Sequence, residues 1–187
     1  MDRRKAIKHT TLLLGTALSG GTMAGLMAGC KAEIKLGWEP SFFNSKEAQT
    51  LESLVDTILP KTETPAASEV GVPAYIDDII GHFWKAEDQK QFQNDLTKVN
   101  KRAHNLFGAP YAELSTAEQN KIMDHLVEKA RSAGTENQPF FLQLKELTYS
   151  GYFTSEFIGE EVLAYDPVPG TYIGDLPIED VDQAWSL

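Results

Sequence analysis

The sequence predicts an all-α fold, with a single compact helical domain of about five helices and an irregular C-terminal segment rich in aromatic residues, glycine and proline. Apolar residues recur at three- and four-residue intervals in five separate segments between residues 45 and 150, the spacing of helices with one buried face. No sustained alternation of apolar and polar residues suggests strands in these segments. The chain also has no internal repeat at a period typical of solenoids.

The first two helices are predicted from their caps and apolar faces. Ser45 is the expected N-cap of the first, and Pro60 stops it. Its buried face comprises Ala48, Leu51, Leu54, Val55, Ile58 and Leu59. The second helix begins at Val72-Pro73, where proline occupies the first helical position and its missing N–H does no harm. Its apolar side comprises Ile76, Ile79, Ile80, Phe83 and Trp84.

Three further helices follow. Residues 87–107 hold helical phase and precede Gly108, which suits a left-handed C-cap. The next helix begins with a capping box, in which Ser115 and Glu118 satisfy each other's backbone donors, and ends at Gly134. A fifth helix is expected over residues 139–150.

The segment after Gly151 has a different character. Its aromatic residues alternate with glycines and prolines, a composition that does not build a core of its own, and they include Tyr152, Phe153, Phe157, Tyr165 and Tyr172. Such a segment lies either over its own helices or against a partner. Composition leaves both interpretations open.

The N-terminus is predicted to be an export signal. Arg3-Arg4 precedes a weakly apolar stretch, residues 10–29, which is the layout of a twin-arginine signal. Several glycines interrupt this stretch, so it is a poor membrane span. Small residues before Cys30 resemble a lipobox, which would make Cys30 the lipid-bearing first residue of the mature protein. The alternative is an ordinary cleaved signal with an incidental cysteine. The expected organisation is thus a signal peptide at 1–29, a tether at 30–44 and a helical domain at 45–187.

Charge and cysteine content exclude several classes of protein. The whole chain has net charge −10, and the predicted signal has four basic residues and one acidic residue, a net of +3, so the remainder carries −13. A strongly acidic domain does not bind nucleic acid and adheres poorly to anionic lipid, so a lipid on Cys30 would have to hold it at the membrane. With the single cysteine acylated, disulfides, cysteine-ligated iron–sulfur clusters and a CxxCH haem site are excluded.

No catalytic, cofactor-binding or metal-binding residue is predicted on this chain. The histidines outside the predicted signal, His82, His104 and His125, form no HExxH motif, and phosphate-binding glycine motifs are missing from the sequence. The adjacent acidic residues Asp77-Asp78, Glu160-Glu161 and Glu179-Asp180 are interpreted as ordinary solvated charges, since neighbours on a helix point about 100° apart.

Several segments carry a family resemblance. Residues 51–60 (LESLVDTILP) and 71–80 resemble the opening helix and the following segment of the gluconate 2-dehydrogenase subunit 3 family, the small or gamma subunit. The longest match is C-terminal. The residues that fit that family's pattern are Phe140-Phe141, the GYFTSE run at 151–156, Tyr165, Pro167-Val168-Pro169-Gly170, Tyr172 and Gly174. The similarity covers roughly residues 45–176, although a lipobox is not a general feature of the family.

The resemblance implies an accessory subunit rather than an enzyme. Its partner would be a large FAD-containing dehydrogenase of the glucose-methanol-choline type, which holds the flavin and the substrate pocket, often with a cytochrome c subunit that carries haem c. The small subunit would supply the twin-arginine signal for export of the folded complex. The expected location is the periplasm, with a lipid anchor in the inner or outer membrane.

Within this picture, residues 148–174 are expected to contact the flavoprotein, with Tyr152, Phe153, Tyr165 and Tyr172 as interface residues. The substrate stays open, because relatives serve gluconate, glucose, fructose and, as glucoside 3-dehydrogenases, the 3-position of glycosides. A free-standing periplasmic lipoprotein enzyme and a binding module unrelated to redox are the alternatives.

Overall fold

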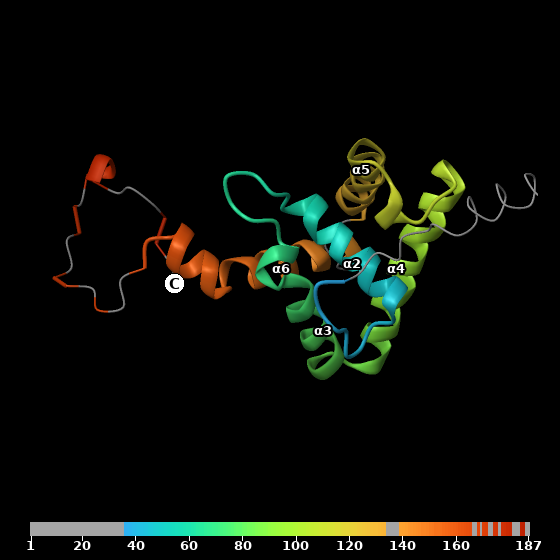
Figure 1. Cartoon of the computed structure of the whole chain (residues 1–187), viewed down its shortest axis with the longest axis horizontal. Coiled ribbons are helices and arrows are strands. Elements are labelled where there is room, and N and C mark those ends of the chain that lie inside the picture. The colour runs from blue at the N-terminus through green and yellow to red at the C-terminus, as the bar shows by residue number, and fades with distance from the viewer. Residues whose placement is uncertain are drawn as a thin grey trace, which may run out of the picture. The chain divides into compact units, whose positions relative to one another are not determined.

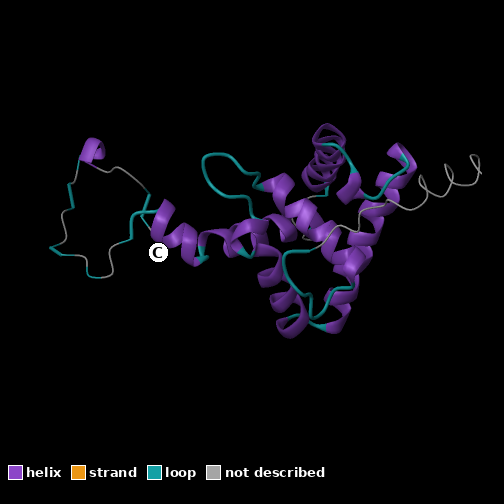
Figure 2. Cartoon of the chain, in the orientation of Figure 1, coloured by secondary structure: helices purple, strands orange, loops and turns teal. Residues whose placement is uncertain are grey.

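The computed structural model describes residues 36–133 and 139–165, together with 168, 170, 171, 174, 175, 177–180, 184 and 185. In this part of the chain the fold is all-α, as predicted (Figures 1 and 2). The helices are α2 (Ser45–Ile58), α3 (Val72–Phe83), α4 (Ala86–Phe107), α5 (Thr116–Ser132) and α6 (Phe140–Phe153). Short helical turns are η1 (Ser68–Val70), η2 (Tyr111–Glu113), η3 (Ile158–Val162) and η4 (Ile178–Asp180).

Three of the predicted site residues, Arg3, Arg4 and Cys30, lie outside the described residues, as does the whole predicted signal. None of the described helices is both long enough and apolar enough to span a bilayer.

The start of α2 differs from the prediction by one residue. Asn44, not Ser45, is the N-cap, and its side chain accepts hydrogen bonds from the backbone N–H groups of Lys46 and Glu47, at 3.0 and 3.1 Å. Glu47 accepts in return from the N–H of Asn44. Asparagine caps as well as serine does. Only a cap at 44 places a glutamate, Glu47, at the third helical position, so the capping box of Asn44 and Glu47 makes Asn44 the N-cap instead of Ser45.

The other helix ends mostly agree with their sequence signals. The left-handed cap at Gly108 has φ 77° and donates its N–H to the carbonyl of His104. The predicted capping box of α5 is confirmed, with the backbone N–H and hydroxyl of Ser115 both donating to the Glu118 carboxylate. The fifth helix is longer than predicted, because α6 continues through Gly151 to Phe153.

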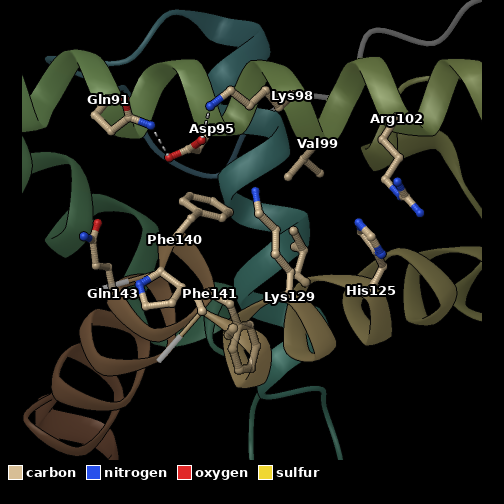
Figure 3. A pocket seen from close by; sticks show the side chains of 14 residues that line it. Gln91, Asp95, Lys98, Val99, Arg102, His125, Lys129, Phe140, Phe141 and Gln143 are labelled. Atoms are coloured by element: carbon tan, nitrogen blue, oxygen red, sulfur yellow. Dashed lines mark hydrogen bonds and ion pairs between the residues drawn. The ribbon is translucent and has the colours of Figure 1, made fainter. Parts of the chain in front are cut away.

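The core is organised around α2, which packs against each of the other four helices. Its buried face comprises Ala48, Leu51, Leu54 and Val55, joined in one cluster by Ile76, Ile80, Phe92, Leu96, Ile122 and Leu144. The helix α6 runs along both α3 and α5. Between α4, α5 and the beginning of α6 lies a cavity of about 650 Å³ (Figure 3).

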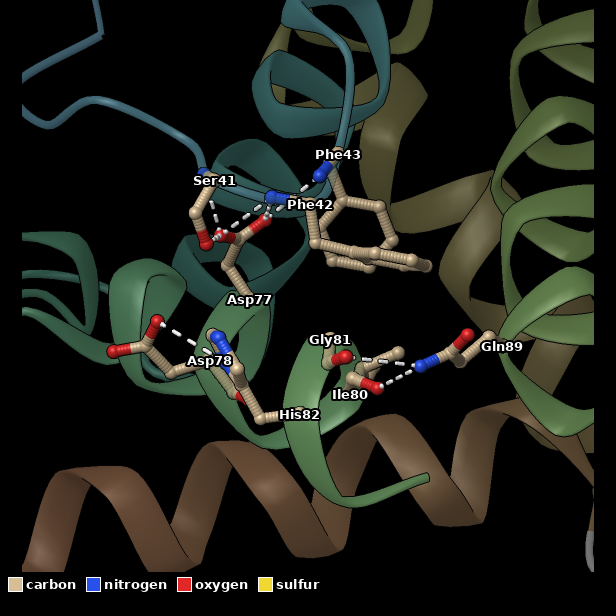
Figure 4. Close-up of polar contacts among 9 residues, drawn as sticks. All are labelled: Ser41, Phe42, Phe43, Asp77, Asp78, Ile80, Gly81, His82 and Gln89. Carbon is tan, nitrogen blue, oxygen red and sulfur yellow. Dashed lines mark hydrogen bonds and ion pairs between the residues drawn. The ribbon is translucent and has the colours of Figure 1, made fainter. Parts of the chain in front are cut away.

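Asp77 corrects the interpretation of the Asp77-Asp78 pair as two solvated charges. Asp78 is exposed, but Asp77 is only 1% exposed. Its carboxylate accepts hydrogen bonds from three consecutive backbone N–H groups, those of Ser41, Phe42 and Phe43, and from the Ser41 hydroxyl, with closest distances of 2.7–3.1 Å (Figure 4). Charge-assisted bonds of this kind offset the cost of burying a carboxylate.

The same contacts draw residues 36–44 into the folded unit, although they were predicted to belong to a tether. The Phe43 ring is 4% exposed and lies 6.0 Å from the Phe92 ring, centroid to centroid. The indole of Trp38 donates to Glu52 at 2.9 Å, and burial raises the pKa of that carboxyl. The compact unit that contains the helices accordingly begins at Leu36.

A buried polar network ties α2 and α4 to η2. Asn100 donates to the hydroxyl of Thr50 and accepts from the backbone N–H of Tyr111 at 3.0 Å. The Tyr111 side chain is fully buried, with its hydroxyl 3.0 Å from that of Thr57. Burial raises the pKa of Tyr111 to about 12. Each buried polar group in this network has a hydrogen-bond partner, which offsets the desolvation cost of its burial.

Candidate partner-binding surface

The C-terminal half of α6 is held in place by its buried face. Leu144, Thr148, Gly151 and Tyr152 follow helical spacing and lie against the core. A Cβ atom at Gly151 would lie 2.6 Å from Cδ1 of Tyr75, so the backbone of α6 approaches this ring more closely than any other residue would allow. The two helices α3 and α6 therefore meet at a fixed point, and this fixes the direction in which the exposed face of α6 points.

Tyr152, one of the predicted interface residues, belongs to that buried face. It is 5% exposed, and its hydroxyl donates to the carbonyl of Pro65 at 2.9 Å. Its ring thus packs on its own chain with its polar end satisfied, a usual arrangement for a buried tyrosine. For this residue the structure favours the alternative of packing on the chain's own helices.

The adjacent, solvent-facing side of α6 carries aromatic side chains that its own chain leaves partly uncovered. Tyr149 is 38% exposed and Phe153 is 50% exposed, with their rings edge to face at 6.2 Å. The ammonium of Lys145 lies 5.3 Å from the centre of the Tyr149 ring. Together, Lys145, Tyr149 and Phe153 form a stripe at intervals of four residues along one side of the helix.

Further exposed aromatic residues follow α6 in the irregular segment. Phe157 is 50% exposed, and the chain then passes through η3 to Ala164, whose N–H donates to the carbonyl of Ala184 at 2.8 Å. An isolated parallel bridge pairs Ala164 with Trp185. Where these segments meet lies a hollow of about 440 Å³, lined among others by Phe153, Tyr165 and Trp185.

We call Tyr149, Phe153, Phe157, Tyr165 and Trp185 the aromatic surface; their exposed fractions run from 38% to 57%. Of the predicted interface residues, Phe153 and Tyr165 belong to it, whereas Tyr172 lies outside the described residues. Tyr149, Phe157 and Trp185 were not predicted as interface residues. The four-residue spacing from Lys145 to Phe157 would have indicated the first two, but nothing local to Trp185 predicts its pairing with Ala164.

Chemically, the aromatic surface is suited to contact with another protein. The hollow is also lined by the exposed Glu156 and Glu160, and none of its described lining residues is a histidine or cysteine. Across the described residues, no three histidine, cysteine or acidic side chains are grouped so that they could hold a metal ion. Clustered exposed aromatic rings with an acidic rim are typical of surfaces that bind another protein.

Comparison with known proteins adds one finding. The model of the family described as gluconate 2-dehydrogenase subunit 3 matches residues 45–170, from the start of α2 into the irregular C-terminal segment. Neither the curated proteins nor the solved structures gave a match.

Proposed function

The chain belongs to the gluconate 2-dehydrogenase subunit 3 family, and from this premise we propose that it is the non-catalytic small subunit of a periplasmic, membrane-associated sugar or sugar-acid dehydrogenase complex. Its partner in this proposal is a large FAD-containing subunit of the glucose-methanol-choline type, with a cytochrome c as a further partner. The flavin and the substrate pocket belong to the large subunit, and the small subunit supports its export, assembly and anchoring.

The observation that carries the proposal is the aromatic surface. Phe153 and Tyr165 are 50% and 55% exposed, and both lie inside the region that the family model matches. Large side chains with few rotatable bonds lose little freedom on binding, so they are frequent among the residues that dominate binding energy. Because the buried face of α6 sets the position of Phe153, this part of the surface is formed before the partner arrives, which lowers the cost of association.

The export role rests on the N-terminal sequence. Arg3-Arg4 provides the twin-arginine signal and Cys30 the lipid attachment site. A flavoprotein that takes up its cofactor before export has to cross the membrane folded, and the twin-arginine route accepts folded proteins. A signal on the small subunit can therefore serve both chains if the interface forms first in the cytoplasm.

The interface is tested by two truncations and a matched control. Phe153→Ala and Tyr165→Ala should each weaken binding to the large subunit by about 2 kcal/mol or more while the isolated small subunit unfolds at the same temperature as wild type. Phe83→Ala is the control, because Phe83 is 77% exposed at the end of α3 and outside the aromatic surface. Binding is measured by titration calorimetry with the purified flavoprotein.

Normal affinity of both variants for the large subunit, or equal weakening by Phe83→Ala, would contradict the interface. Loss of subunit stability with unchanged affinity would instead place the two aromatic rings in the core.

Export is tested with the double substitution Arg3→Lys and Arg4→Lys in cells that make both subunits. Unprocessed small subunit should accumulate in the cytoplasm, and the flavoprotein should stay there with it. Cys30→Ser tests the anchor separately, since it should release exported complex from the membrane fraction. Lipidated protein in the periplasm despite both lysines would refute the twin-arginine assignment.

A further inference from the structure

The cavity between α4, α5 and the beginning of α6 is separate from the aromatic surface and shares none of its residues (Figure 3). Its volume of about 650 Å³ falls within the range of pockets that hold small organic molecules, about 300–1,000 Å³. Its lining combines basic side chains from two facing helices with apolar side chains. The basic side chains indicate a negatively charged group on the ligand, and the apolar side chains indicate an apolar body.

The basic side chains approach each other across the cavity. Arg102 extends from α4 toward α5, and His125 and Lys129 extend from α5 toward α4 (Figure 3). Among the described residues that line the cavity one is acidic, Asp95, and it is already engaged by Lys98 at 2.7 Å and by Gln91 at 2.9 Å. Its charge is therefore largely neutralised before it can act on Arg102 or Lys129.

Arg102 and Lys129 have no ion pair with any side chain in the described part of the chain. Nε of Arg102 is buried and lacks an acceptor among the described residues. A buried N–H without an acceptor carries a desolvation cost, and the exposed ammonium of Lys129 adds positive charge on the facing helix. This occurs in a chain of net charge −10, in which acidic residues are plentiful. An anion bound here would supply the acceptor that Nε of Arg102 lacks and would neutralise the positive charge of the lining.

Apart from Gln143, the remaining lining is apolar. Val99 comes from α4, Leu126 and Ala130 from α5, and Phe140 and Phe141 from the first turn of α6. Such walls gain little from a bare inorganic ion, but they would bury the carbon body of an organic one. A guanidinium binds carboxylate and phosphate oxygens in pairs, which defines the head group.

We propose that this cavity binds a small organic anion, with a carboxylate or phosphate head between Arg102, His125 and Lys129 and an apolar body against Phe140 and Phe141. The site is independent of the role proposed for the aromatic surface, and either can fail without the other. Its occupation would neutralise the two unpaired cations and join α4 to α5.

Calorimetry on the full chain tests the proposal with three probes: phenyl phosphate, benzoate and inorganic phosphate. Phenyl phosphate or benzoate should bind one site per chain, more tightly than inorganic phosphate does. No heat of binding from either aromatic probe at about 10 mM would overturn the proposal. Inorganic phosphate as tight as phenyl phosphate would overturn the apolar part of the site. Binding of a glutamate-rich peptide without binding of the small probes would overturn the small-molecule assignment.

Substitutions locate the site. Arg102→Gln and Lys129→Gln should each weaken the binding of phenyl phosphate by about tenfold or more. Arg131→Gln is the control. Arg131 lies on α5, the helix of Lys129, but it is exposed, pairs with Glu128 at 2.8 Å and does not line the cavity. Equal weakening by Arg131→Gln would show nonspecific attraction and overturn the site.

A measurement on the unmodified chain covers the case in which a variant fails to fold. Phenyl phosphate should shift the imidazole NMR signals of His125 and leave those of His82, an exposed residue of α3 outside the cavity, in place. A shift of His82 alone, or of neither histidine, would refute binding between α4 and α5.

Discussion

Replacing Asp77 by asparagine should destabilise the domain more than the same replacement of Asp78, the other acidic residue of α3. The carboxylate has two oxygens, and both accept backbone N–H groups: Oδ2 takes that of Ser41 at 2.7 Å and Oδ1 takes that of Phe43 at 2.8 Å. Asparagine offers one oxygen and one NH₂ group. Whichever way the amide turns, a donor then faces a backbone donor, and at least one N–H loses its acceptor.

The magnitude follows from these bonds. A lost hydrogen bond to a charged group costs about 1.5–3 kcal/mol, and the bonds that remain weaken from charged to neutral strength. Removing the buried charge returns part of this through desolvation. We therefore expect Asp77→Asn to lower the free energy of unfolding by about 3 kcal/mol and to loosen residues 41–43, including the buried ring of Phe43.

The assay is equilibrium unfolding in urea, with limited proteolysis to detect release of residues 36–43. Asp78→Asn is the matched control, because Asp78 is the next residue on the same helix and its side chain is 68% exposed. An unfolding free energy of Asp77→Asn within about 0.5 kcal/mol of the control would refute the reasoning, as would an unchanged rate of cleavage in residues 36–43.

Three further predictions concern stability. Gly151→Ala should destabilise the domain by about 1–2 kcal/mol because its Cβ meets the Tyr75 ring, and a thermal melt that shows the usual gain of about 1 kcal/mol from Gly→Ala in a helix would disprove the close approach. Burial raises the pKa of Tyr111 to about 12, so the contribution of this side chain to stability is complete below about pH 10 and declines as the pH rises toward 12. In urea unfolding, the stability advantage of wild type over Tyr111→Phe should therefore be about 1.4 kcal/mol smaller near pH 11 than near pH 8. An equal advantage at both pH values would contradict the raised pKa. Glu118→Ala should cost about 1 kcal/mol through loss of the α5 capping box, and a melting temperature equal to that of wild type would count against it.

Helix positions could be predicted from the sequence because their signals are local. The left-handed glycine at 108 and the serine–glutamate pair at 115 and 118 act within one or two turns, and the apolar spacing of α2 identifies its buried face without knowledge of what covers it. The error at Ser45 was equally local, since two adjacent residues are both good caps and the choice depended on which one has a glutamate three positions later.

The candidate site could be predicted only in part. Composition indicated that residues 148–174 contain the aromatic residues of interest, and Phe153 and Tyr165 are indeed exposed. It could not separate them from Tyr152, because one helical step of about 100° decides which ring faces the core. The extension of α6 past Gly151 was also missed, since a glycine that reads as a helix end in the sequence is here required by the ring of Tyr75.

By itself, the sequence determined the all-α class, the family, and the positions of the helices, because periodicity, caps and motifs are encoded in neighbouring residues. The tertiary structure decided which polar and aromatic side chains are buried and which are brought together. Asp77 is identical to Asp78 in chemistry and differs only in facing residues 41–43, which are distant in sequence. Arg102 and Lys129 form a basic cavity only because α4 and α5 pack side by side. Burial and charge proximity depend on contacts between distant segments, and no local pattern encodes those contacts.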